Sequence, residues 1–398
     1  MKIIFLGESY VFPLSLLFTK FVKLGATAYG GPAMISQIKE TTVKQNGWIK
    51  EGEFMRGAAL CQLIPGATMV QIVTYIGYRA RGIWGALTAA IAFVLPAFIA
   101  LLILSAVYFE YHSLWLIQAL FKGLGAVIVS IILNTCIIFG KSILKDWKVI
   151  LIAVLSFFAF FFQWNFVLIF LLAAVAGFVL RPKTPPAKPA SAGLPLSETN
   201  QREYLVVALL AAFICLLFVF SYLLNPEITA LSLGLSKIGA LAIGGGFTAI
   251  PLIQYEIVDQ HKWLATKEFL DGIALGQVTP GPILITATFV GYKIAGFIGA
   301  VMATVGIFFP SFFILVLLIP FHDRLQGVQK VRMIEQAVLG SFMGMLALVL
   351  YNFGRASLVD IPRILMAAAA FFALYRKIGL PYILLAGGLF SVLIYGFI

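Results

Sequence analysis

The sequence predicts an all-α polytopic membrane protein built from two homologous halves. Of its 398 residues, 62% are hydrophobic and only 11% are charged, whereas soluble globular proteins are about 25% charged. Apolar runs such as residues 82–109 exceed the ~20 residues that a helix needs to cross a bilayer. These runs are continuously apolar rather than alternating, which indicates helices and excludes a β-barrel. An internal repeat divides the chain into its two halves.

Apolar segments separated by polar loops predict about thirteen transmembrane segments. They fall at residues 11–29, 54–78, 82–109, 116–140, 149–162, 164–180, 204–224, 229–250, 269–292, 295–320, 333–353, 361–375 and 379–397. The segments at 149–162 and 361–375 are short for a full crossing, so tilted or partly re-entrant helices are expected there.

The net charge of +12 comes from Lys and Arg scattered in short loops. If the N-terminus lies in the cytoplasm, most of these Lys and Arg residues fall in cytoplasmic loops, as the positive-inside rule requires. The exception is the segment 30–53, which is expected to be an outside loop although it is locally basic. This distribution indicates a bilayer as partner and gives no reason to expect binding to nucleic acid.

Two stretches of the chain repeat each other in register. The segment WIKEGEFMRGAALCQLIPG at 48–66 aligns without gaps on WLATKEFLDGIALGQVTPG at 263–281. Upstream, KLGATAYGG at 23–31 matches KIGALAIGG at 237–245. Glycine and proline positions downstream agree as well, so the match covers roughly seventy residues and indicates a duplication.

The repeat predicts four parts: an N-terminal repeat (1–180), a Pro-rich cytoplasmic linker (181–203), an extra span (204–228) and a C-terminal repeat (229–398). The N-terminal repeat contains six apolar segments, and the unmatched extra span follows it. An odd number of crossings makes the second copy enter the membrane from the opposite face. The sequence therefore predicts an inverted-topology repeat with broken helices, an architecture found in many secondary transporters.

Each half carries two candidate helix breaks at matching positions, a glycine cluster and a Pro-Gly element. The residues are Gly30, Gly31 and Pro32 with Gly244, Gly245 and Gly246, and Pro65 and Gly66 with Pro280, Gly281 and Pro282. Non-helical backbone survives in a membrane only when it is buried in protein or lines a cavity. Paired breaks in two halves point to a transport site, whose open helix ends suit an anion. Close helix packing and harmless kinks are the alternative, which the double occurrence disfavours.

Four side chains near these breaks are candidate ligands. Gln62 and Gln277 precede the Pro-Gly elements and carry amide donors for an oxyanion, with interhelical hydrogen bonding as an equal alternative. Lys23 and Lys237 are repeat mates on the segments that lead into the glycine clusters. A matched pair of cations suits a dianion, whereas snorkelling to the interface is the alternative.

Two further repeat pairs carry charge. Glu53 and Glu268 could carry protons, but capping of the following helix is favoured because its dipole attracts an acid in the first turn. Arg56 aligns with Asp271, so this position breaks the symmetry of the repeat. Arg56 either guards an entrance or lies at the membrane interface.

The chain shows no signature of an enzyme or of a cofactor. It lacks the GxxxxGK[ST] phosphate-binding loop of ATP-driven pumps, and its three histidines are far apart without an HExxH motif. Its three cysteines have unrelated spacing, so neither a metal site nor a disulfide framework is expected.

The motifs AYGGPAMI (28–35) and AIGGGFTAIPLI (242–253), together with the two Pro-Gly segments, closely resemble the chromate ion transporter family in its long two-domain form. The resemblance implies export of chromate, or of the similar oxyanion sulfate, across a bacterial cytoplasmic membrane. It places the family signature on the two glycine clusters, on Gln62 and Gln277, and on the two Pro-Gly elements. Ala67 departs from the family pattern, in which a second proline often follows Pro-Gly.

The leading hypothesis is therefore a secondary transporter that works by alternating access. A transporter of another inorganic or organic anion in the same scaffold and a passive anion channel are the alternatives. The coupling partner, a proton or a counter-anion, is left open, and a homodimer is compatible with the sequence.

Overall fold

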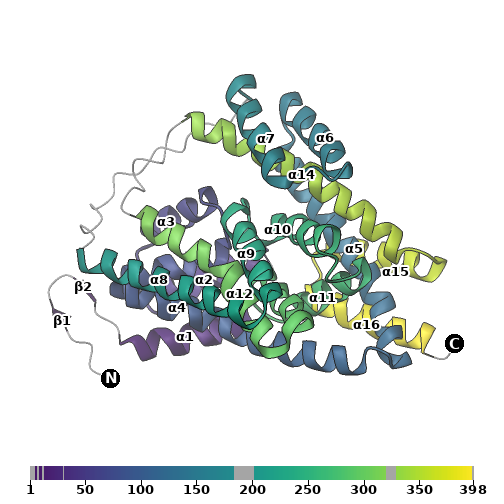
Figure 1. Ribbon diagram of the computed structural model, residues 1–398, viewed down its shortest axis with the longest axis horizontal. Coiled ribbons are helices and arrows are strands. Elements are labelled where there is room, and N and C mark those ends of the chain that lie inside the picture. The colour runs from purple at the N-terminus through teal and green to yellow at the C-terminus, as the bar shows by residue number, and fades with distance from the viewer. Residues whose placement is uncertain are drawn as a thin grey trace. The chain divides into compact units, whose positions relative to one another are not determined.

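The computed structural model describes residues 5–6, 9–10, 13–29, 31–182, 201–319 and 329–396 (Figure 1). Gly30 and most of the predicted linker lie outside the described residues. The rest is almost entirely helical, which confirms the all-α prediction. A two-residue antiparallel pair, β1 (Phe5–Leu6) and β2 (Ser9–Tyr10), precedes the first helix.

The helices follow one another along the chain with few long connections. In order they are α1 (Leu14–Thr27), α2 (Gly31–Lys39), η1 (Glu40–Gln45), α3 (Glu51–Leu63), α4 (Thr68–Tyr111), α5 (Trp115–Ile143), α6 (Trp147–Phe161), α7 (Phe166–Leu180), α8 (Gln201–Leu224), α9 (Pro226–Leu241), α10 (Gly246–Gln254), η2 (Tyr255–Gln260), α11 (Thr266–Val278), η3 (Ile283–Ile285), α12 (Thr286–Leu318), α14 (Gln329–Ser357), α15 (Ile361–Tyr375) and α16 (Leu380–Tyr395).

Among the described residues, five helices are long and apolar enough to cross a membrane. They lie at Thr68–Tyr111, Trp115–Ile143, Leu205–Leu223, Ile283–Leu318 and Arg332–Ser357. Four shorter apolar helices, α6, α7, α15 and α16, accompany them. The protein is thus a multi-pass membrane protein, while the count of thirteen crossings stays a prediction.

The chain divides into two compact units, and each takes segments from both repeats. The first draws its described residues from Met1–Ile103, Pro189–Gly246 and Thr279–Gln326. The second draws them from Leu104–Lys188, Phe247–Val278 and Gly327–Ile398. The compact units therefore do not coincide with the two repeats.

In the first unit the two repeats make the same helix crossing. A Cβ on Gly25 in α1 would overlap the carbonyl oxygen of Phe93 in α4. At the equivalent place of the second repeat, a Cβ on Gly239 in α9 would overlap the carbonyl oxygen of Ile307 in α12. Each crossing is close enough that only glycine fits, so the backbone of the broken helix lies directly against a long apolar helix.

Both long helices of this unit reverse sharply near one end. In α4 the backbone leaves helical geometry at Arg81 and Gly82, and in α12 it does so at the repeat mates Ala295 and Gly296. The two glycines adopt positive φ values of 60° and 56°, which glycine tolerates without steric cost. Each long helix is therefore two helices joined by a tight turn, as the separate apolar segments predict.

The prediction of an outside loop at 30–53 is wrong for much of its length. The chain forms α2 there and continues as the π-helix η1, and the second repeat has α10 and the π-helix η2 at the equivalent place. Met34, Ile38 and Thr42 are buried at a spacing of four residues, which is one face of a helix. Charged residues on the other face made the stretch read as a loop: Lys44, for example, pairs with Glu40 one turn away, at 3.0 Å.

The second unit is a bundle organised by α5 and α14. The helices α15 and α16 pack on α5, and α6 and α7 pack on α14 (Figure 1). Two apolar clusters hold the second group: one joins Val149 and Ala153 to Met343, and the other joins Ile152 to Ala337. The helix α11, which leads into the second Pro-Gly element, packs on α5, α14 and α16.

The glycine crossing generates a stability prediction. Gly239→Ala is expected to lower the melting temperature of the purified protein in detergent, because overpacking a tight contact costs about 1–3 kcal/mol. Gly354→Ala in α14 is the matched control, since nothing lies within 4 Å of its Cβ position. The control is expected to keep or slightly raise the melting temperature because alanine favours helix. Equal melting temperatures for both variants would contradict the crossing.

Candidate functional site

The four predicted breaks are real interruptions of helices. The helix α1 ends at Thr27 and α2 begins at Gly31, while α9 ends at Leu241 and α10 begins at Gly246. The helix α3 ends at Leu63 before α4, and α11 ends at Val278 before η3. With 13 residues each, α3 and α11 are ~20 Å long, which is short of the ~30 Å hydrocarbon core.

Within the first unit each Pro-Gly break bonds to the glycine break of the other repeat. The backbone N–H of Gly66 donates to the carbonyl oxygen of Ala242 at 2.5 Å. The N–H of Gly281 donates to the carbonyl oxygen of Ala28 at 2.9 Å. Ala28 and Ala242 are repeat mates, as are Gly66 and Gly281, so the two hydrogen bonds are one contact made twice. They bring the four predicted breaks together in pairs.

The glycines at these breaks hold conformations that other residues rarely adopt. Gly66 and Gly281 have φ values of 131° and 115°, and Gly244 and Gly245 have 89° and 108°. A Cβ at Gly281 would also overlap the side chain of Ala97. All four positions therefore require glycine for their backbone conformation, and Gly281 requires it for space as well.

Side chains satisfy further backbone groups at the first Pro-Gly break. The N–H of Ala67 donates to Ser311 Oγ at 2.9 Å, and Ser311 Oγ donates in turn to the carbonyl oxygen of Gly239 at 3.3 Å. The Nε2 of Gln71 donates to the carbonyl oxygen of Pro65 at 2.8 Å. Buried backbone groups outside a helix need such partners in a membrane. Ser311 and Gln71 are not among the site residues that the sequence predicts, although Ser311 directly follows the matched Pro310.

The two predicted glutamines differ in environment. Gln62, near the end of α3, is exposed. Gln277, near the end of α11, is 5% exposed, and its Nε2 has no hydrogen-bond partner among the described residues. A buried amide donor without an acceptor is unfavourable by about 1–3 kcal/mol unless something else accepts its hydrogens. Gln277 is thus the stronger candidate ligand of the pair.

The predicted cations lie at the surface of the structure. Lys23 in α1 and Lys237 in α9 are both exposed, one turn before their breaks. Arg56 in α3 is half-buried. Gly31 and Pro32 open α2, and the side chain of Pro282 is buried just before η3.

The two repeat-mate glutamates have separate roles. Glu268 accepts a hydrogen bond from the backbone N–H of Ala265 at 2.9 Å, which confirms the expected cap at the start of α11. Glu53 lies in the first turn of α3 and forms an ion pair with Arg79. No proton-carrying role is needed to explain either position.

Asp271 and Tyr108 form a buried pair in the second unit. The hydroxyl of Tyr108 donates to Asp271 Oδ2 at 2.7 Å, and the two residues are 6% and 5% exposed. Sequence reasoning singled out Asp271 only because it aligns with Arg56. Its tyrosine partner comes from a helix 163 residues away in the chain, so no local pattern could have found it.

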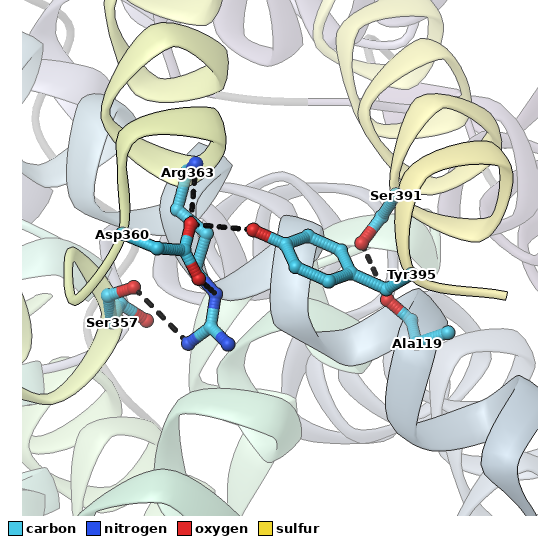
Figure 2. Close-up of polar contacts among 6 residues, drawn as sticks. All are labelled: Ala119, Ser357, Asp360, Arg363, Ser391 and Tyr395. Carbon is cyan, nitrogen blue, oxygen red and sulfur yellow. Dashed lines mark hydrogen bonds and ion pairs between the residues drawn. The ribbon is translucent and has the colours of Figure 1, made fainter. Parts of the chain in front are cut away.

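A second polar cluster of the same unit joins the ends of three helices (Figure 2). Asp360 caps α15 by accepting the N–H of Arg363 at 2.9 Å, and Arg363 Nε lies 3.0 Å from Asp360 Oδ2. The hydroxyl of Tyr395 in α16 donates to Asp360 Oδ1 at 2.5 Å, and Ser391 donates to the carbonyl oxygen of Ala119 in α5. These contacts tie the ends of α15, α16 and α5 to one another.

Apolar helices, two internal repeats and matched helix breaks define this chain as a multi-pass membrane transport protein. Comparison of the sequence with protein families supplies the particular group: the profile described as chromate transporter matches residues 15–178 and again 229–392. The chain belongs to the chromate transporter family. The double match confirms the two-repeat arrangement, and the family consists of transport proteins rather than enzymes.

Relatives cover nearly the entire chain. An uncharacterized transporter of Methanocaldococcus jannaschii is 34% identical over 93% of this chain and 91% of its own length. Chromate transport proteins of Cupriavidus metallidurans and Pseudomonas aeruginosa are each 29% identical, covering 94% and 95% of this chain and 92% of their own lengths. No solved structure matches the chain.

The hydrogen bond between Ser311 and the first Pro-Gly break can be tested by mutation. Ser311→Ala removes the acceptor of the buried Ala67 N–H, which is expected to destabilise the fold by about 1–3 kcal/mol. A lower melting temperature in detergent and reduced transport are the expected results. Ser142→Ala is the control, because that exposed hydroxyl bonds only within its own helix. A Ser311→Ala protein as stable and active as the control would show that Ser311 does not support the break.

The α15 cap generates a pH prediction. Burial acts to raise the pKa of Asp360, but hydrogen bonds from Tyr395 and from the Arg363 N–H, with the charge of Arg363, outweigh it and hold the pKa below its usual range. The ionised form therefore stabilises the fold above the unfolded pKa of about 3.9, and this contribution is lost as the pH falls through the lower folded-state pKa.

Asp360→Asn is expected to flatten the acid side of the stability profile, measured as melting temperature against pH. Its melting temperature is expected to fall below that of the wild type at neutral pH and to approach it at acid pH. A parallel offset at every pH would contradict the assignment.

Proposed function

We propose that this protein is a secondary active transporter that exports chromate, or the similar tetrahedral oxyanion sulfate, across a bacterial cytoplasmic membrane by alternating access. Membership of the chromate transporter family and two relatives described as chromate transport proteins support chromate as a substrate. The direction, the mechanism and sulfate as a second substrate are the further parts of the proposal.

The reciprocal pairing of broken helices is the observation that carries the proposal. The helices α2, α4 and α10 each begin directly after a break. The first-turn N–H groups of a helix lack intrahelical acceptors and carry the positive end of the helix dipole. Such ends favour an anion over a cation, and paired interruptions in two repeats are typical of transporter binding sites.

The proposed ligands are the residues at these breaks and the polar groups beside them. They are Lys23, Gly30, Gly31, Pro32, Gln62, Pro65, Gly66, Lys237, Gly244, Gly245, Gly246, Gln277, Pro280 and Gly281. Among them, the buried Nε2 of Gln277, which has no acceptor among the described residues, is the side-chain atom with the clearest need for one. An oxyanion would supply that acceptor.

The proposal includes the membrane topology. With the N-terminus in the cytoplasm, the extra span (204–228), most of which is α8, crosses the membrane once between the two repeats. This additional crossing inverts the second repeat (229–398) relative to the first (1–180). The linker (181–203) then lies in the cytoplasm. This orientation is tested by introducing single cysteines near the two Pro-Gly elements and labelling them from each side of the membrane.

The two alternatives to this proposal are a transporter of another anion in the same scaffold and a passive anion channel. Radiotracer flux of chromate and sulfate in proteoliposomes under defined pH and voltage separates them from the proposal. A transporter accumulates substrate against its gradient when a driving ion is supplied. A channel conducts uncoupled current, and a transporter of a different anion leaves both tracers unmoved.

The candidate ligand generates a kinetic prediction. Gln277→Ala is expected to lower the rate of oxyanion flux about tenfold, since loss of one hydrogen bond to a charged ligand is worth about 1.5–3 kcal/mol. Smaller losses are expected for Gln62→Ala and Lys23→Ala, whose side chains are exposed. Gln118→Ala in α5, also exposed, is the control. Unchanged flux for all three variants would remove these residues from the site.

A further inference from the structure

Among the described residues, the buried carboxyl of Asp271 has no cation within ion-pair distance, and Lys267, one helical turn earlier, acts on it only through its charge. Its hydrogen bond comes from the neutral hydroxyl of Tyr108 at 2.7 Å. Removing a carboxylate from water without a compensating charge is costly. Acidic residues inside membrane segments are rare for this reason, and they mark proton or ion pathways.

The surroundings of Asp271 contain few other charges. Its own helix α11 carries Lys267 and Glu268, and Glu268 is engaged in the cap at the helix start. The helices packed most extensively on α11 are α5, α14 and α16. The end of α4 adds Tyr108 and, stacked on its ring, His112. Two of the basic residues on these helices are engaged elsewhere: Lys122 lies over the ring of Tyr395, and Arg355 lies over that of Tyr351.

Comparison of the two repeats shows whether the fold requires an acid at the position of Asp271. The first repeat has Arg56 at the equivalent place, and Arg56 is half-buried whereas Asp271 is 5% exposed. The fold therefore does not need an acid at this point of the helix. The second copy alone carries a buried titratable group there.

The same helix links Asp271 to the candidate binding site. Gln277 lies six positions further along α11, and the helix ends at Val278 just before the Pro280-Gly281 break. A change of charge at Asp271 changes the cost of keeping α11 buried. Such a change can bias the arrangement of the break that follows, as coupling between two sites requires.

We propose that Asp271 is the proton-binding site of this transporter, with Tyr108 as the hydrogen-bond donor that steadies its carboxylate when the proton has left. In each cycle one proton binds to the carboxylate from one side of the membrane and the same proton leaves to the other side. Tyr108 keeps its own proton and is a positioning residue. The coupling role rests on the proposed transport function, whereas the proton site itself does not.

Proton binding is tested first without any substrate. Infrared difference spectra of the purified full-length protein across its stable pH range report the C=O stretch of a protonated, buried carboxylic acid. A titrating band is expected in the wild type, absent in Asp271→Asn and retained in Glu268→Gln, an acid on the same helix. Absence of the band from the wild type, or its persistence in Asp271→Asn, overturns the proposal.

Tyr108→Phe keeps the ring and removes the donor. Since the donor favours the charged carboxylate, the midpoint of the band is expected to move to higher pH by about one unit. An unchanged midpoint overturns the pairing, and this variant decides the question if Asp271→Asn does not fold.

Coupling is tested in proteoliposomes with chromate and sulfate tracers and an internal pH dye. Asp271→Asn is expected to exchange substrate within about twofold of the wild-type rate and to lose pH-driven accumulation at least tenfold, while Glu268→Gln keeps both. Retained pH-driven accumulation in Asp271→Asn overturns the coupling role, and so does equal loss of exchange and accumulation. If the wild type moves neither tracer, the proposed substrate has failed, and the infrared result still decides whether Asp271 binds a proton.

Discussion

The reciprocal hydrogen bonds between the breaks are the contact on which the first unit depends. An interrupted helix in a membrane leaves backbone N–H and C=O groups that neither lipid nor its own turn can satisfy. Here Gly66 supplies an N–H to Ala242, and Gly281 supplies one to Ala28. Each repeat thus completes the backbone of the other. One copy alone would have unsatisfied groups at both of its breaks, which explains why these bonded breaks of the two copies lie in the same compact unit.

The two copies share the backbone contacts at their breaks and crossings but differ in the side chains beside them. Ser311 stands where the first repeat has Ala97, so a hydroxyl supports the Gly66 break and only a methyl group lies against Gly281. Asp271 stands where the first repeat has Arg56. A symmetric frame makes the two arrangements of a transporter similar in energy, and unequal side chains allow a ligand or a proton to act on one of them.

Much of the fold follows from local patterns. Long apolar runs require helices in a bilayer, and Pro-Gly or multiple glycines cannot continue a helix without loss, so element type and the places of the breaks could be predicted. The helices α2 and η1 could not, because the burial of Met34, Ile38 and Thr42 on one face depends on the segments that cover them. Short amphipathic segments are ambiguous for this reason.

By itself the sequence determined the all-α class, the duplication and the four interruptions, because each depends on composition or on glycine and proline at defined positions. Only the tertiary structure decided which groups complete those interruptions, that Gln277 is buried while Gln62 is exposed, and that Tyr108 reaches Asp271. These outcomes depend on contacts between residues far apart in the chain. Helix packing sets such distances, and no periodicity along the sequence records them.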